Sequence, residues 1–143
     1  MWGQKRTMND ADRLSAEFCK NFELLNWHDS QLLGFSVTEL SRSHRVSLDI
    51  RWVQRSNIEE KVGKVIFNEC TYMILDLDLD GKMVCSDSIA CGICQINSAL
   101  KGQLQSEKFK FEPGRLNDFY HFTIELIPPG GEMHIFAKSF EVE

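Results

Sequence analysis

The strongest constraint on the fold of this chain is an alternating pattern that continues on both sides of a proline- and glycine-rich connection. From Phe119 to Ile127, apolar side chains occupy every second position, as in a half-buried strand. The pattern resumes over residues 132–142, after the sequence Pro-Pro-Gly-Gly at 128–131. Because proline fixes φ and glycine accepts positive φ, this connection predicts a tight turn. The C-terminal part of the chain is therefore predicted to be an antiparallel hairpin.

The same period of two recurs earlier in the chain. Residues 44–53 alternate most clearly, and their apolar face consists of Val46, Leu48, Ile50 and Trp52. Further strands are predicted at 31–40, 62–68, 72–79 and, as a short one, 108–112. Residues 86–96 are mixed in character, and we expect a short helix there.

A helical period precedes the strands. Between Asp10 and Asn26, apolar residues follow the helical repeat, and the stripe consists of Leu14, Phe18, Phe22 and Leu25, with Cys19 beside it. One amphipathic helix followed by antiparallel strands predicts an α+β fold, in which the N-terminal helix packs on a bent antiparallel sheet of about six strands. The expected core contains that stripe and inward-facing strand residues such as Phe35 and Leu75.

Composition narrows the class of protein. A length of 143 residues, with 43% hydrophobic and 26% charged residues, predicts a single globular domain over 1–143. No apolar run reaches the ~18 residues that span a bilayer, and no secretion signal is visible, so we expect a cytoplasmic protein without membrane contact. A net charge of −5 opposes nucleic-acid binding, which needs a basic field.

Charge is distributed unevenly along the chain. Residues 40–64 hold six Lys or Arg and three Asp or Glu, whereas residues 65–100 hold one Lys and five Asp or Glu. Within the acidic part, Asp76, Asp78 and Asp80 alternate with leucines and would form an acidic ladder on one face of a strand. Such a face can attract a basic protein partner. Asp76, Asp78 and Asp80 are therefore the predicted partner-binding residues.

The same acidic segment has an alternative interpretation as a calcium-binding loop. From Asp76 to Asp87, acids stand at positions 1, 3, 5 and 12 and glycine at position 6, which is close to the EF-hand spacing. However, position 12 lacks the usual Glu, and strand-like residues precede the loop where an EF-hand needs a helix. The competing interpretation is a hairpin that turns at Asp80-Gly81 and returns over 83–85 with its leucines inward. We favour the hairpin and expect neither a metal nor a cofactor.

Five cysteines are present, and an odd number without a secretion signal predicts reduced thiols. Cys91 and Cys94 form a C-x-x-C, which together with Cys85 could supply three thiolates to zinc. No second C-x-x-C occurs, and the surrounding pattern does not predict the βαβ context of a redox motif. Packed, reduced thiols are therefore the favoured interpretation.

Histidines provide further candidates for chemistry. His28 and Asp29 have the residue types of a general base and its orienting carboxylate, but turns also use these residues routinely, and we favour a turn. His121 and His134 lie on the two arms of the C-terminal hairpin at unequal distances from its turn, so we do not predict a metal pair. No motif for a nucleophile, a P-loop or a dinucleotide is present, and we predict no enzymatic activity and no catalytic residue.

Short segments at both ends carry a resemblance to known proteins. They are Trp-His-Asp-Ser at 27–30, His-Phe-Thr-Ile-Glu-Leu at 121–126 and Gly-Gly-Glu-Met-His-Ile-Phe-Ala-Lys at 130–138. In this outline the chain resembles a group of small bacterial proteins, many of them uncharacterised and some similar to immunity proteins of polymorphic toxin systems. The resemblance implies a small non-catalytic binding protein whose partner is another protein, such as a toxin. It implies no particular binding residue.

Overall fold

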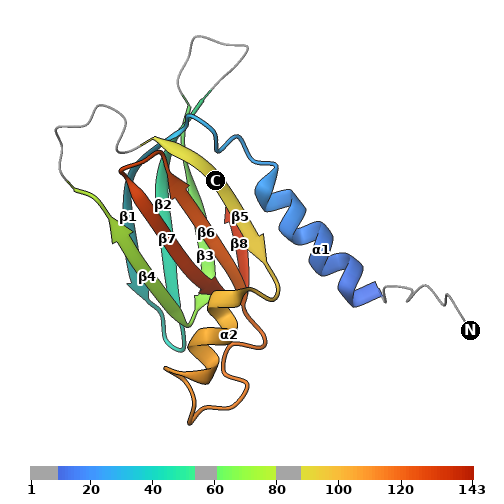
Figure 1. Cartoon of the computed structure of the whole chain (residues 1–143). Helices are drawn as coiled ribbons and strands as arrows, with labels where there is room; N and C mark the ends of the chain where they lie inside the picture. Colours follow the sequence, from blue (N-terminus) through green and yellow to red (C-terminus); the bar gives the residue numbers. More distant parts are fainter. Residues whose placement is uncertain (1–9, 54–60, 80–87) are drawn as a thin grey trace, which may run out of the picture.

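The structure, a computed structural model, describes residues 10–53, 61–79 and 88–143. Two helices and eight strands occur in these ranges, and every strand pairing is antiparallel. The strands form two sheets of four (Figure 1). The predicted α+β class is therefore confirmed. No helix in these ranges has the length and apolar character needed to cross a membrane.

Each sheet combines strands from distant parts of the chain. Sheet A has the order β1-β2-β3-β8, with β1 at Gln31–Glu39, β2 at His44–Trp52, β3 at Lys61–Cys70 and β8 at Ser139–Val142. Sheet B has the order β4-β7-β6-β5, with β4 at Tyr72–Leu77, β5 at Ile89–Gln95, β6 at Tyr120–Leu126 and β7 at Gly131–Ala137. The bent sheet expected from the sequence is thus divided into two sheets.

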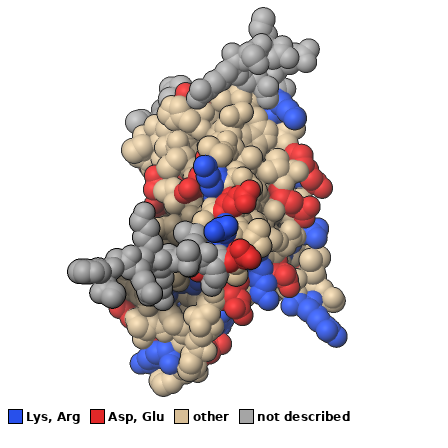
Figure 2. Space-filling model, turned by 90° about the vertical axis from the view of Figure 1, so that its right-hand side faces the viewer, with Lys and Arg blue, Asp and Glu red and all other residues tan. Residues whose placement is uncertain are grey.

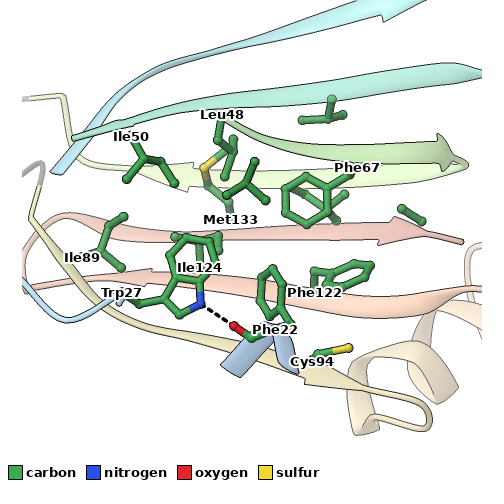
Figure 3. Close-up of a cluster of buried hydrophobic side chains, with 14 of the residues drawn as sticks. Phe22, Trp27, Leu48, Ile50, Phe67, Ile89, Cys94, Phe122, Ile124 and Met133 are labelled. Carbon is green, nitrogen blue, oxygen red and sulfur yellow. Dashed lines mark hydrogen bonds between the residues drawn. The ribbon is translucent and has the colours of Figure 1, made fainter. Parts of the chain in front are cut away.

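The two sheets pack face to face, and the main core lies between them (Figure 3). Strand β2 contributes Val46, Leu48, Ile50 and Trp52, as the alternation predicts. Strands β6 and β7 contribute Phe122, Ile124, Met133 and Ile135, which are fully buried. Burying such side chains stabilises the fold by ~1.5–3 kcal/mol each.

The division into two sheets occurs at Lys138. The predicted returning strand over 132–142 separates there into β7 of sheet B and β8 of sheet A, and the Lys138 amide donates to the Asn68 carbonyl over 3.1 Å. Inward-facing positions are odd-numbered up to Ala137, whereas Phe140 packs on the core from an even-numbered position. The single alternating strand predicted over 132–142 therefore did not indicate that the chain passes from sheet B to sheet A.

Helix α1, at Asp10–Glu23, covers the edge of the sandwich formed by β5 and β8 (Figure 1). The Phe22 ring lies 4.9 Å from that of Phe122 and 5.0 Å from that of Phe140. Cys19 is buried with Phe22, and Phe18 and Leu25 pack partly on the core. The expected burial of Leu14 is wrong: this side chain is 67% exposed, because the first turns of α1 extend beyond the sheets.

The second helix lies elsewhere than expected. Residues 89–95 of the predicted helical segment form β5, and Gly92 leaves the space in which Trp27 packs. Helix α2 is at Ala99–Ser106 and is capped by the Ser98 side chain. The expected strand over 108–112 is a series of turns, in which Phe109 is buried and Phe111 exposed. Phe109 packs with Leu116 and Phe136 on the outer face of sheet B.

No described helix or strand covers the edge of the sandwich opposite α1, which we call the open edge. Phe35 on β1 pairs with Leu48, and Leu75 on β4 pairs with Met133, so both side chains point toward the space between the sheets. They are nevertheless 40% and 39% exposed, which contradicts their expected burial. A hollow of about 280 Å³ lies at this edge, between residues 32–35 of β1 and residues 77–79 at the end of β4. The sequence pattern correctly predicted that Phe35 and Leu75 face inward, but it did not predict that they remain partly exposed to solvent.

Candidate functional site

Three carboxylates form a row across the outer face of sheet B. Asp76 on β4 is opposite Glu132 on β7, and Glu132 is also opposite Glu125 on β6. Their neighbours Met133 and Ile124 face the core, so the three acids point to the other side. Asp76 is exposed, and the two glutamates are half-buried. We call Asp76, Glu125 and Glu132 the acidic row.

The acidic row is electrostatically unfavourable in isolation, because like charges directly opposite one another destabilise a sheet. Within the described ranges, none of the three carboxylates forms an ion pair with a lysine or arginine. On the side of the molecule that carries α1, by contrast, basic side chains lie among acidic ones (Figure 2). Among the described residues, therefore, no lysine or arginine neutralises the negative charge of the row.

A hollow of about 390 Å³ lies beside the acidic row. All three carboxylate residues line it, together with Ala90, Leu126, Pro128, Pro129 and Gly131. The cis peptide bond between Pro128 and Pro129 and the positive φ of Gly131 shape the turn that borders it. This turn confirms the predicted hairpin connection. Negative charge and apolar proline surface thus border the same hollow.

A chain of hydrogen bonds runs from the acidic row toward α2. The His134 Nε2 lies 2.9 Å from Glu132 Oε1, and His134 Nδ1 lies 2.8 Å from His121 Nε2. The His121 Nδ1 lies 2.6 Å from the Ser98 Oγ, which also accepts the Lys101 amide. One assignment satisfies every bond: the Ser98 hydroxyl donates to His121, His121 to His134, and His134 to the Glu132 carboxylate. We call these four residues the histidine chain.

Burial keeps His121 neutral in this chain. The side chain is buried, and desolvation, together with electrostatic interactions with His134 and Lys101, lowers the pKa of His121 to about 4. The Lys101 ammonium donates to the carbonyls of Ile96 and Phe119 at 2.7 Å each. Burial also lowers the pKa of Lys101. The Lys101 bonds hold α2 against the chain next to β5 and β6, and the His134 bond fixes the orientation of the Glu132 carboxylate.

The sequence pattern did not predict the contact between His121 and His134. The register places His121 opposite Phe136 and Thr123 opposite His134, so the histidines are indeed not directly opposed. They are diagonal neighbours on one face, and long side chains reach across that separation. In the part of the chain that the structure describes, no cluster of three or more His, Cys, Asp or Glu residues could hold a metal ion.

The comparisons with known proteins do not assign this chain to a family. Searches with family models, curated proteins and solved structures found no match.

The predicted partner-binding residues separate into different positions. Asp76 belongs to the acidic row, whereas Asp78 follows β4 and is exposed, with its backbone amide donating to the Gly130 carbonyl over 3.0 Å. Asp80 lies outside the described residues, as do the hairpin turn at Asp80-Gly81 and most of the calcium-loop candidate Asp76–Asp87. Residues preceding that candidate form the strand β4, where an EF-hand has a helix. Glu125 and Glu132, which complete the row, come from strands distant in sequence and were not predicted.

The two cysteines of the C-x-x-C do not meet. Cys91 donates from its Sγ to Glu125 Oε2 over 3.1 Å, whereas Cys94 Sγ lies 2.7 Å from Cys19 Sγ. Three residues along a strand place side chains on opposite faces, so the pair cannot jointly bind a metal or form a redox centre. Cys85, the third thiol of the zinc alternative, lies outside the described residues.

Residues 27–30 form a turn, as favoured from the sequence. Asp29 has a φ of 68°, and the buried Ser30 donates from its Oγ to the Asn26 carbonyl and accepts the Val53 amide. The Trp27 Nε1 donates to the Phe22 carbonyl over 2.7 Å (Figure 3). His28 Nε2 and Asp29 Oδ2 lie 3.5 Å apart at an exposed position. This segment joins α1 to β1.

Proposed function

We propose that this is a small non-catalytic binding protein, and that its acidic row docks a basic surface of a protein partner. The observation that carries the proposal is the placement of three carboxylates opposite one another on adjacent strands, with no lysine or arginine of the described residues to neutralise them. Desolvating such a cluster against an apolar partner would be costly. A partner that supplies cations instead relieves the repulsion within the row.

Lysine or arginine side chains suit the hollow beside the row. Their charged ends can reach the carboxylates of Asp76, Glu125 and Glu132, while their alkyl stems cover Pro128 and Pro129. Arginine can also form two parallel hydrogen bonds with one carboxylate. The bond from His134 holds Glu132 in one orientation, which reduces the entropy lost on binding.

The resemblance to immunity-like proteins agrees with this role. A toxin with a basic surface is the partner class we propose, with both proteins in the cytoplasm. A calcium-binding module over Asp76–Asp87 is the alternative, and the strand β4 before the loop weighs against it.

Comparing captured proteins between two charge-matched variants tests the proposal. One variant carries Asp76→Asn, Glu125→Gln and Glu132→Gln; the control carries Glu17→Gln, Glu39→Gln and Glu107→Gln at positions outside the row. We expect a basic protein from a lysate of the source cells to bind the wild type and the control at low salt, and to be lost from the row variant. With the purified partner, the row variant should slow association at least tenfold, and the control should not.

Equal retention of every captured protein by the two variants would contradict the proposal. So would a partner with an acidic binding surface. Circular dichroism of both variants separates a binding defect from unfolding. We expect both variants to fold, since the substituted side chains are exposed or half-buried. If a toxin gene lies beside the gene for this protein, its purified product is the first partner to measure.

A further inference from the structure

Helix α1 and strand β5 bring two thiols together at the closed edge of the sandwich. Cys19 lies on the buried face of α1, and Cys94 lies on the core side of β5, beside Phe22 and Phe122 (Figure 3). The two side chains are only 7% and 5% exposed. Their Sγ atoms are 2.7 Å apart, so no other atom lies between them. The proposed binding surface does not involve this pair.

A hydrogen bond also holds this part of α1 against β5. The Cys94 amide donates to Glu23 Oε2 over 3.3 Å, one helical turn beyond Cys19. Phe22 anchors the same turn of α1 through its ring contacts with Phe122 and Phe140. The positions of both thiols are thus determined by independent packing and hydrogen bonding. Covalent linkage requires the two Sγ atoms to close from 2.7 Å to the ~2.05 Å of an S–S bond.

We propose that Cys19 and Cys94 form an intramolecular disulfide on exposure to a small-molecule disulfide such as glutathione disulfide, and that this bond locks α1 onto sheet B. Because 75 residues separate the two positions along the chain, the bond closes a long loop. A long loop loses much of its freedom in the unfolded state, so the bond stabilises the folded state.

The reaction proceeds by two thiol–disulfide exchanges. The thiolate of one cysteine attacks a sulfur of glutathione disulfide, which forms a mixed disulfide and releases one glutathione as its thiolate. The second cysteine, as its thiolate, attacks the protein sulfur of the mixed disulfide and releases the other glutathione. Two protein thiols are oxidised, one glutathione disulfide is reduced to two glutathione molecules, and the two protons pass to the released thiolates.

The other described thiols have different partners. Cys70 donates from its Sγ to the Phe67 carbonyl over 3.4 Å, and Cys91 donates to Glu125. Burial raises the pKa of both Cys70 and Cys91 to about 11. Burial also raises the pKa of Cys19 and Cys94, so oxidation is slow at neutral pH and accelerates in alkali. Its selectivity arises from the proximity of Cys19 and Cys94.

Intact mass and peptide mapping of the full chain after incubation with glutathione disulfide at alkaline pH test the proposal. We expect a product that has lost two hydrogen atoms, whose linked peptides join Cys19 to Cys94. Its thermal midpoint should rise by on the order of 10 °C and return to the starting value on reduction. The control variant Cys70→Ser/Cys85→Ser/Cys91→Ser should form the same bond, and Cys19→Ser should not.

Three results would overturn the proposal: glutathione adducts without an internal bond, an internal bond that involves Cys70, Cys85 or Cys91, or an oxidised product that melts no higher than the reduced chain. The wild-type peptide map decides the pairing even if a cysteine variant fails to fold. Circular dichroism of the oxidised chain before and after reduction verifies that the native fold persists throughout the measurement.

Discussion

His121 Nε2 lies 2.8 Å from His134 Nδ1, within hydrogen-bonding distance, although neither histidine is directly opposite the other in the sheet. The bond requires one nitrogen to donate and the other to accept. Protonating His121 would place a second donor between Ser98 and His134. The histidine chain therefore depends on neutral His121, in agreement with its lowered pKa of about 4.

Acidification should destabilise the protein through His121. The folded pKa of about 4 lies below the ordinary value of 6.5, so the unfolded state binds the proton more readily between these pH values. We expect the free energy of unfolding to fall by about 2 kcal/mol between pH 7 and pH 5 from this group. Urea denaturation at the two pH values measures the effect.

Two histidine variants provide the controls for this pH effect. His121→Gln should have a smaller pH dependence than the wild type, even though it is less stable at neutral pH. His28→Ala, which removes an exposed histidine, should leave the dependence intact. An identical pH dependence in the wild type and His121→Gln would show that another group is responsible.

Gly92→Ala should be strongly destabilising. A Cβ at this position would lie 2.5 Å from the Trp27 Nε1 and 2.6 Å from its Cε2, so the indole or the backbone of β5 must move. Overpacking of this kind costs about 2 kcal/mol. Gly102→Ala in α2 is the matched control: it meets no atom within 4 Å and should stabilise the helix by about 1 kcal/mol. Similar thermal midpoints for the two variants would contradict this description of β5.

Two apolar positions of α1 should respond very differently to truncation. Phe22→Ala removes a fully buried ring and should cost about 4 kcal/mol of unfolding free energy. Leu14→Ala removes an exposed side chain and should change stability by less than about 0.5 kcal/mol. Chemical denaturation of both variants measures the difference. A large cost at Leu14 would mean that α1 packs along its whole length.

Neutralising one end of the acidic row should stabilise the isolated protein. Asp76→Asn removes a negative charge directly opposite Glu132, and we expect a gain of roughly 0.5 kcal/mol at low salt. The gain should shrink at high salt, because ions screen exposed charges. The salt dependence of the thermal midpoint, compared with that of Glu17→Gln, measures it. A loss of stability would indicate that the carboxylate has a favourable partner.

Calcium should not change the thermal midpoint if the acidic segment is a strand and its continuation. A ligand that binds only the folded state raises the midpoint, so melting with calcium and with a chelator separates the two interpretations of Asp76–Asp87. A calcium-dependent rise of several degrees, abolished in Asp76→Asn, would instead support the metal-binding alternative.

Periodicity predicted those parts of the fold in which neighbours along the chain determine the structure. Helix α1, strand β2 and the turn at 128–131 follow from local spacing and from the conformational limits of proline and glycine. Strand β5 was missed because its burial depends on Trp27, which is remote in sequence. Non-local packing of this kind overrides local preference.

The acidic row was predicted only in part for the same reason. Asp76 was identified from alternation along one strand, but Glu125 and Glu132 join it through the order β4-β7-β6. Neither the strand order nor the register can be calculated from alternation alone. The diagonal contact of His121 with His134 likewise requires the register of β6 against β7.

The open edge of the sandwich has a consequence for handling the protein. Leu33, Phe35 and Val37 of β1 are all at least 40% exposed, and β1 is the outermost strand of sheet A. Apolar strands at a sheet margin promote aggregation in concentrated solution. Colloidal stability therefore depends on the net charge of −5 and should be poorest near the pI of about 5.4, where that charge vanishes. Purification and storage well above this pH, at modest ionic strength, should keep the chain dispersed.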